Sequence, residues 1–252
     1  MLAVLRIPIW REGSVALEHA SLRRSDVLRG EGVTRGDGAP VLLIPGFMAG
    51  DPSLTTMARW LTRMGYRPCR ARMRINVDCT SRALERLEEE LEGQFERHGR
   101  KVTIVGQSRG GIMARILAVR RPDLVEGIVC LGSPLTDQLA VHPLVRAQVT
   151  AVGVLGSLGV PGLFAYGCGF GDCCEEAREQ ATRAPFPAGV GFVSVYSKRD
   201  GIVDWRACLD PAAKQIEVDA SHLGMALNAQ VYEVVGKALA PRRARARMRV
   251  AA

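Results

Sequence analysis

The sequence lacks a cysteine framework. Its seven cysteines, an odd number, are scattered along the chain, and none forms a CxxC pair. This pattern is typical of free thiols in a reducing compartment and not of a disulfide scaffold. One disulfide is left open, because Cys168 lies near Cys173 and Cys174 in sequence, with Cys208 as a further partner. Zinc is not expected at these cysteines, since no four-ligand spacing appears.

The sequence also lacks a secretory signal and a convincing membrane span. The first apolar stretch is short and is interrupted by Arg6 and Pro8, so it does not predict a cleaved signal. The uncharged run 147–171 is long enough to be tested as a membrane helix, but glycines and Pro161 break it up. It also lies between two predicted strands. We therefore expect a cytoplasmic protein.

Basic charge is concentrated at the C-terminal end. The formal net charge is +8, and five arginines fall within the last eleven residues, where there is no acidic residue. Without these five, 29 basic residues face 26 acidic ones, so the rest of the chain is close to neutral. We expect residues 241–252 to form a basic, solvated and disordered tail, and we expect no nucleic-acid partner.

From residue 41 to residue 240 the sequence alternates between strand and helix patterns. Short β-branched runs such as 102–105 and 125–131 are typical of buried strands, and segments such as 81–98 have one apolar face. This alternation predicts one α/β domain with a mostly parallel sheet and helices on both faces. Residues 1–40 are expected to form an N-terminal extension that contains a helix.

Two helix boundaries are predicted less sharply. Asp78, Thr80 and Ser81 are all suitable N-caps for the segment 81–98, and the sequence does not choose among them. The apolar positions of 223–239 predict a single amphipathic helix near the end of the domain.

Gly106-Gln107-Ser108-Arg109-Gly110 joins a predicted strand to a predicted helix. Strand, G-x-S-x-G and helix in this order are the context of a nucleophile elbow. The turn is so sharp that side chains two residues before and two residues after the serine would collide, which explains both glycines. We therefore expect Ser108 to be a nucleophile.

A nucleophilic serine needs a base, and the base needs an orienting carboxylate. His222 lies between the last predicted strand and the last helix, the third place in the order serine, acid, histidine. Of the other three histidines, His19 and His98 are expected at the surface and His142 in an insertion. For the acid we favour Asp200, which directly follows the strand 192–196, over Asp204, because strand ends hold side chains firmly.

The developing charge on the substrate needs two backbone N–H groups, an oxyanion hole. One is expected from Arg109, the residue after the nucleophile. The other is expected from Phe47, in the loop that follows the strand 41–44. Since Arg109 contributes its backbone, the sequence gives its side chain no role beyond a surface charge.

Four segments of the sequence resemble motifs of a known protein superfamily. VLLIPGF, VGQSRGG, YSKRDGIVD and ASHLGM resemble the oxyanion loop, the elbow, the acid loop and the histidine loop of the α/β-hydrolase superfamily, in its bacterial lipase and esterase branch. Pro45 and Gln107 depart from the histidines that often stand there in lipases, which weakens a claim to true lipase activity. The resemblance covers residues 40–240 and implies ester hydrolysis through an acyl-enzyme, with no metal or organic cofactor.

The segment 134–189 is predicted to be an insertion that forms an apolar lid, in preference to a plain buried helix pair. Such a lid suits apolar acyl esters, and it leaves open a peripheral contact with a lipid surface. We therefore expect a serine carboxylesterase or lipase-like hydrolase that acts through Ser108. The alternatives are a thioesterase or amidase with the same triad and a non-catalytic lipid-binding module. The sequence predicts no oligomeric state.

Overall fold

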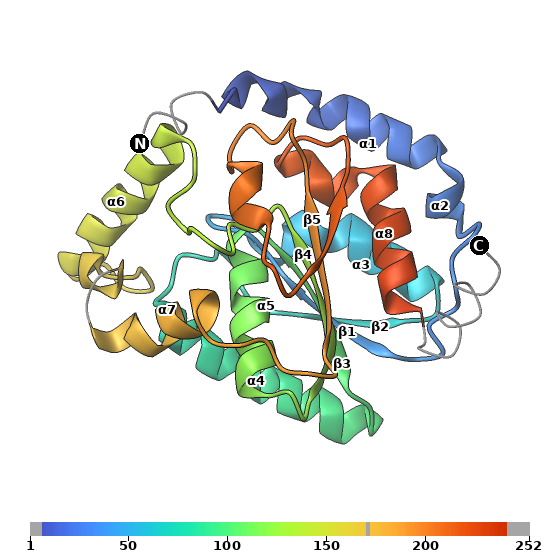
Figure 1. The fold of residues 1–252 in the computed structure, drawn as a ribbon, viewed down its shortest axis with the longest axis horizontal. Helices are drawn as coiled ribbons and strands as arrows, with labels where there is room; N and C mark the ends of the chain where they lie inside the picture. The colour runs from blue at the N-terminus through green and yellow to red at the C-terminus, as the bar shows by residue number, and fades with distance from the viewer. Residues whose placement is uncertain (1–6, 170–171, 241–252) are drawn as a thin grey trace.

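Six parallel strands form a single sheet at the centre of the molecule (Figure 1). The computed structural model describes residues 7–169 and 172–240. In chain order the strands are β1 (Pro40–Ile44), β2 (Arg67–Arg70), β3 (Val102–Gln107), β4 (Val125–Leu131), β5 (Gly191–Tyr196) and β6 (Lys214–Glu217). Their order across the sheet is β2-β1-β3-β4-β5-β6, and every neighbouring pair is parallel. The predicted parallel sheet is confirmed.

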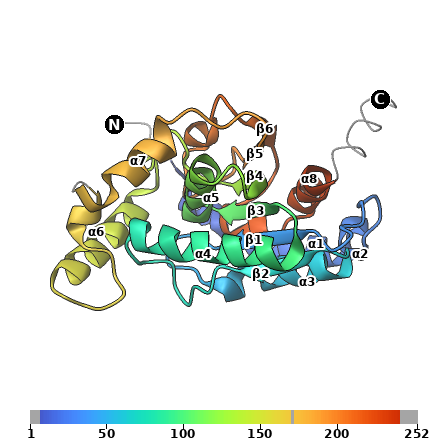
Figure 2. The ribbon, with the colours of Figure 1, turned by 90° about the horizontal axis from the view of Figure 1, so that it is seen from below.

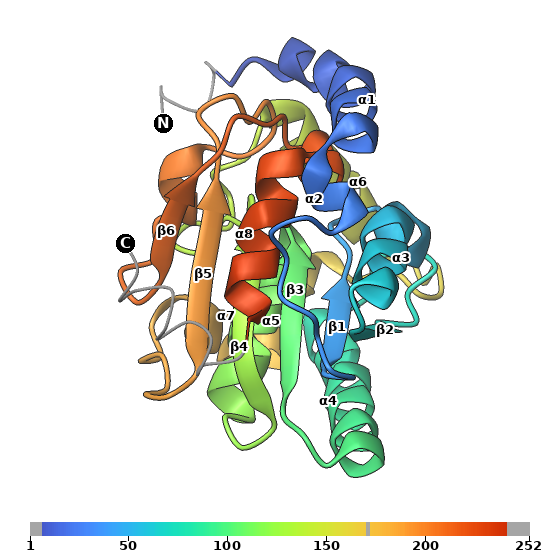
Figure 3. The same ribbon diagram turned by 90° about the vertical axis from the view of Figure 1, so that its right-hand side faces the viewer.

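One face of the sheet is covered by α3 (Thr55–Arg63) and α8 (Ala229–Leu239), with α2 (Asp26–Arg29) beside them (Figure 3). Trp60 of α3 and Tyr232 of α8 are fully buried there, with ring centroids 4.8 Å apart. The indole of Trp60 donates a hydrogen bond to the carbonyl of Val27 in α2 at 2.8 Å. The N-terminal segment is therefore part of the hydrophobic core of this face.

The opposite face is covered by α4 (Thr80–His98), α5 (Arg109–Arg120) and α7 (Glu175–Thr182). Arg115 of α5 is buried here and pairs with Asp210 at 2.8 Å. The same guanidinium donates to the carbonyl of Ala184 at 3.0 Å, which ties the end of the α7 region to α5. Helices thus cover both faces, as the sequence predicted.

A helical insertion separates β4 from β5. It contains α6 (Pro143–Ser157), the short 3-10 helices η4 (Tyr166–Gly169) and η5 (Asp172–Cys174), and α7. Figure 2 shows α6 and α7 to one side of the sheet, beyond α4 and α5. Gly153 is the one buried residue of α6, so the alternative of a plain buried helix pair is wrong.

The N-terminal segment consists of η2 (Ile9–Ser14), α1 (Val15–Arg24) and α2. Ser25 has extended backbone angles, which divides the helix expected in this extension into two. Figure 3 shows α1 on the side toward which the strands β3 and β5 point, the carboxyl ends of the sheet. In the part of the chain that the structure describes, no helix combines the length and the apolar character that crossing a membrane requires.

Two boundaries differ from the predictions. The segment 223–239 divides into η7 (Leu223–Leu227) and α8, because the Asn228 side chain caps α8 by accepting from the Gln230 N–H at 3.0 Å. The N-cap of α4 is Cys79, and none of the three predicted candidates holds that position. The predicted disordered tail at 241–252 lies outside the described residues.

Candidate active site

Ser108 follows the last residue of β3 and precedes the first residue of α5. Its φ of 51° is rare for a residue with a side chain and is typical of a strained functional turn. A Cβ atom on Gly106 would lie 2.3 Å from the carbonyl oxygen of Gly110, and one on Gly110 would lie 2.2 Å from the carbonyl oxygen of Ile44. Both glycines are therefore steric requirements of the elbow.

Asp200 lies in the loop after β5, and His222 lies in the loop after β6. The Oδ2 atom of Asp200 is 2.7 Å from Nδ1 of His222, and both side chains are buried. The other carboxylate oxygen accepts the N–H groups of Ile202 at 2.8 Å and Val203 at 2.7 Å, which hold the acid in one orientation. A buried carboxylate in this position orients an imidazole and stabilises its protonated form.

Asp204, the alternative acid, does not contact His222. Its carboxylate caps η6 (Trp205–Cys208) by accepting the N–H of Arg206 at 3.0 Å, and it pairs with the Arg206 guanidinium at 3.3 Å. The structure therefore brings Asp200, and not Asp204, to the histidine.

Opposing effects act on the pKa of His222. Burial lowers it, but the charge and hydrogen bond of Asp200, together with the charge of Glu12, outweigh burial, so the pKa lies above its usual value. Among the described residues Ser108 Oγ has no hydrogen-bond partner, and Ser108 lines a cavity.

Two carboxylates of the N-terminal segment hold the histidine loop, which no sequence pattern indicated. Glu12 accepts the N–H of His222 at 2.9 Å and that of Gly201, next to Asp200, at 2.8 Å. Glu18 accepts the N–H of Ser221 at 3.0 Å. The extension expected at 1–40 therefore connects the acid loop to the histidine loop.

Gln107, the residue before Ser108, reaches the loop of His222 from the other side. Its buried side chain donates to the carbonyl of His222 at 3.0 Å. This position departs from the histidine of many lipases, and the structure shows what the amide does here. It links the elbow to the backbone of His222.

The predicted oxyanion groups lie in two neighbouring segments. Phe47 follows β1, and the carbonyl of Pro45 in the same loop accepts a hydrogen bond from the buried Asn76 side chain at 2.8 Å. Among the described residues, the N–H groups of Phe47 and Arg109 have no hydrogen-bond acceptor. Phe47, Ser108 and Arg109 all line one cavity.

The Arg109 side chain is not a surface charge, contrary to the expectation from sequence. Its guanidinium donates to the side chain of Asn76 at 2.8 Å, to the carbonyl of Asp78 at 2.6 Å and to the hydroxyl of Thr80 at 3.1 Å. Burial lowers its pKa to about 10, although the charge of Asp78 offsets part of this effect. Arg109 therefore fastens the loop before α4, and through Asn76 it supports the loop that carries Phe47.

The cavity has a volume of about 780 Å³. One wall is formed by apolar residues of α5, among them Ile112 and Ile116, and another by residues of the insertion, among them Val149 and Phe164. The ring of Phe164 lies tilted against that of Phe47, with 6.2 Å between ring centroids, and the Phe164 N–H donates to the carbonyl of Val77 at 2.8 Å. His222 and Asp200 do not line the cavity.

The remaining candidates from the sequence lie elsewhere. His142 caps α6, where its ring accepts the N–H of Leu144 at 3.2 Å, and it does not line the cavity. Cys208, expected near the other cysteines, is instead buried against Val141 and Val203. The cysteine that lies beside Cys168, Cys173 and Cys174 is instead Cys79, which is distant from them in sequence.

The fold is similar to those of solved hydrolases. A metagenomic carboxyl esterase, MGS0156, superposes with a TM-score of 0.61 at 15% identity over 82% of this chain and 76% of its own. The mature lipase BlEst2 of Bacillus licheniformis gives 0.58 at 17% identity, over 81% of this chain and 92% of its own. A monoacylglycerol lipase of Paleococcus ferrophilus gives a TM-score of 0.52 at 17% identity, over 82% of this chain and 96% of its own.

The chain has the α/β-hydrolase fold. At these identities the likeness is one of fold, and the residues of the site carry the argument about chemistry. No protein-family model and no curated protein matches the sequence. Within this fold, the turn at Ser108, the loop of Asp200 and the loop of His222 all lie at the carboxyl edge of the sheet, as the ends of β3, β5 and β6 require.

Proposed function

We propose that this α/β-hydrolase is a serine ester hydrolase that cleaves apolar acyl esters through an acyl-enzyme on Ser108. The observation that carries the proposal is the buried contact between Asp200 and His222, 2.7 Å long, in the loops next to a strained serine. A buried, oriented imidazole and a cavity-lining hydroxyl on an elbow are the parts that acyl transfer needs.

In the proposed reaction, His222 takes the proton of the Ser108 hydroxyl as its oxygen attacks the carbonyl carbon of the ester. The imidazolium is stabilised by Asp200 and then gives the proton to the leaving alcohol as the carbon–oxygen bond breaks. Water next attacks the acyl-enzyme with His222 as base, and the acid product leaves with Ser108 restored.

The N–H groups of Phe47 and Arg109 are proposed to hold the oxyanion. The Arg109 backbone also begins α5, whose N-terminus favours negative charge. Asn76 supports this assignment, since it fastens the Phe47 loop through Pro45 and is itself held by Arg109. A loop held in this way needs little rearrangement when the charge develops.

The cavity supports the proposed substrate class. Its walls from α5 and the insertion are largely apolar, so the acyl part of the ester would be the part that binds there. We propose that the insertion acts as the lid over this cavity.

Contact of the lid with a lipid surface is part of the same proposal. Several large apolar side chains on or next to α6 are exposed; they are Leu139, Leu144, Val154, Leu155, Leu158 and Val160. Single exposed apolar residues are ordinary, but a group on one segment is typical of a surface that meets another apolar surface.

The decisive experiment is intact-mass analysis after treatment with a fluorophosphonate. We expect one adduct on the wild type and on Ser53→Ala, an exposed serine outside the site, and none on Ser108→Ala. No adduct on the wild type, or an adduct retained on Ser108→Ala, would contradict the serine mechanism.

A second measurement decides the leaving group. Acyl esters, thioesters and amides that share one acyl chain are compared by kcat/KM. The proposal expects the esters to be cleaved best and the rate to rise with acyl length until the cavity is filled. A preference for the thioester would move the chain to the thioesterase alternative.

A further inference from the structure

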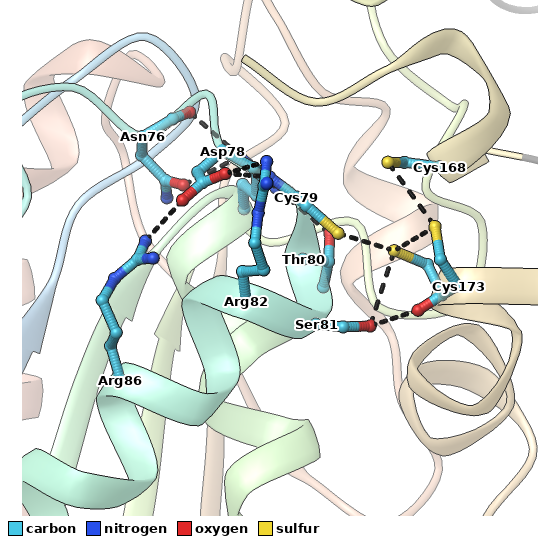
Figure 4. Close-up of polar contacts among 11 residues, drawn as sticks. Asn76, Asp78, Cys79, Thr80, Ser81, Arg82, Arg86, Cys168 and Cys173 are labelled. Atoms are coloured by element: carbon cyan, nitrogen blue, oxygen red, sulfur yellow. Dashed lines mark hydrogen bonds and ion pairs between the residues drawn. The ribbon is translucent and has the colours of Figure 1, made fainter. Parts of the chain in front are cut away.

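Four cysteines meet at the junction between α4 and the insertion. Cys79 precedes α4, Cys168 lies in η4, and Cys173 and Cys174 lie in η5. Their four Sγ atoms all lie within 4.8 Å of one another. Figure 4 shows the sulfur atoms converging from the two sides of the junction.

The distances between the sulfur atoms distinguish a metal site from disulfide bonds. The shortest Sγ–Sγ distances are 3.5 Å between Cys79 and Cys174, 3.6 Å between Cys168 and Cys173, and 3.7 Å between Cys173 and Cys174. A disulfide brings its sulfurs to about 2.05 Å. Four thiolates around one zinc ion, each about 2.3 Å from the metal, have sulfur–sulfur edges of about 3.8 Å, close to the distances observed.

The surroundings suit a negatively charged metal–thiolate centre. The Ser81 hydroxyl lies 3.6 Å from Sγ of Cys174 and donates to the carbonyl of Cys173 at 2.5 Å. The guanidinium groups of Arg82 and Arg109 are near enough to interact with the charges of Cys79 and Cys168. A tetrathiolate zinc centre carries two net negative charges, and these guanidinium groups lower the cost of that charge, while Arg82 also pairs with Asp78 at 2.8 Å.

We infer that Cys79, Cys168, Cys173 and Cys174 bind one zinc ion. Binding converts four thiols to thiolates and releases four protons to solvent, without any change of oxidation state. Four soft sulfur ligands favour zinc over the hard divalent ions. Since the protein supplies all four ligands, the site is closed and its role is structural.

The position of the site gives it a specific task. Cys168 and Cys174 both line the cavity, and Cys79 adjoins the loop that Arg109 fastens. The zinc ion would therefore join the insertion to the body beside the oxyanion loop and hold one wall of the cavity in place. The sequence concealed the site because Cys79 and Cys174 are 95 residues apart.

The test uses the full chain, purified without chelators, and no step of it depends on hydrolase activity. Elemental analysis should find one zinc per chain, and X-ray absorption at the zinc edge should find four sulfur neighbours at about 2.3 Å. Exchange of zinc for Co²⁺ should give thiolate-to-cobalt charge transfer and the strong visible bands of a tetrahedral cobalt centre. The spectroscopy needs no variant, so it stands even if a substitution prevents folding.

Variants then assign the ligands. Cys79→Ser and Cys174→Ser should lose most of the zinc, while Cys69→Ser, a thiol on β2 outside the cluster, should keep it. The proposal is overturned if the wild type holds no zinc when Zn²⁺ is supplied, or if the absorption shows nitrogen or oxygen neighbours. Iron in place of zinc, or a denatured protein with fewer than seven free thiols, would overturn it as well. The zinc measurements and the fluorophosphonate experiment are independent, so either proposal can be contradicted while the other is supported.

Discussion

The carboxylate of Glu12 accepts the backbone N–H of His222 at 2.9 Å, although the two residues are 210 positions apart. The same oxygen accepts the N–H of Gly201, and the second oxygen accepts that of Leu223 at 2.8 Å. One side chain from the N-terminal segment thus holds the loop of the acid and the loop of the histidine together. Its negative charge also adds to that of Asp200 near the imidazole.

The first prediction concerns Glu12→Gln and the pH dependence of hydrolysis. The proposed base acts only when His222 is neutral, so kcat/KM falls as the pH drops through the pKa of His222. Because the charge of Glu12 raises that pKa, removing the charge should move the acid limb to lower pH. The measurement is a pH profile of kcat/KM. Glu31→Gln, which removes an exposed acid paired with Arg29, is the control and should leave the limb in place.

The second prediction separates the two candidate acids. Asp200→Asn should lower kcat by about 10⁴, the loss typical of a triad whose histidine is held in the wrong tautomer. Asp204→Asn should change kcat little, because asparagine is also a good N-cap and η6 keeps its cap. Steady-state kinetics on one ester decide between them. The opposite ranking would assign the acid to Asp204.

The third prediction tests the Arg109 side chain. Arg109→Met keeps the backbone N–H but releases Asn76 and the loop that carries Phe47. Loss of one oxyanion donor costs about 10² to 10³ in kcat, so a loosened donor should cost on the order of 10², with a smaller change in KM. Arg86→Met removes an exposed partner of Asp78 and serves as the control. Equal effects in the two variants would show that Arg109 only maintains the fold.

The fourth prediction compares two glycines by urea unfolding. Gly110→Ala should lower the free energy of unfolding by several kcal/mol, about 3 or more, since its Cβ would lie 2.2 Å from the Ile44 carbonyl. Gly93→Ala, in α4 with no atom within 4 Å of the new Cβ, should raise it by about 1 kcal/mol. A neutral Gly110→Ala would contradict the steric account of the elbow.

Local patterns were sufficient to predict the strands and the elbow. The run 125–131 coincides with β4, because an apolar β-branched segment bounded by turn residues is recognisable without its neighbours. Gly106 and Gly110 were recognisable for the same reason, since the collision they avoid is set by the turn itself. Strands and tight turns of this kind depend only on residues that are close together in the sequence.

The contacts that support the site were not predictable, because each joins distant segments. Glu12 lies in a stretch with no strong pattern, and nothing in its sequence shows that its partner is the backbone of His222. Asn76 and the Arg109 guanidinium meet only because β3 places α5 beside the loop before α4. The prediction of the α4 N-cap was wrong for a related reason. Ser81 is a good N-cap residue, but its hydroxyl donates to the carbonyl of Cys173 instead.

The loop of His222 is held in its conformation by the N-terminal segment, and proteolysis could cut this segment from the rest of the chain. Residues 30–39 connect α2 to β1, and a protease cut there would leave Glu12 and Glu18 on a fragment held by packing, chiefly through Leu22 and Val27. The loop would then be ordered only in the fraction of molecules that retain the fragment. Activity would become dependent on concentration, and adding the fragment back as a peptide would restore it.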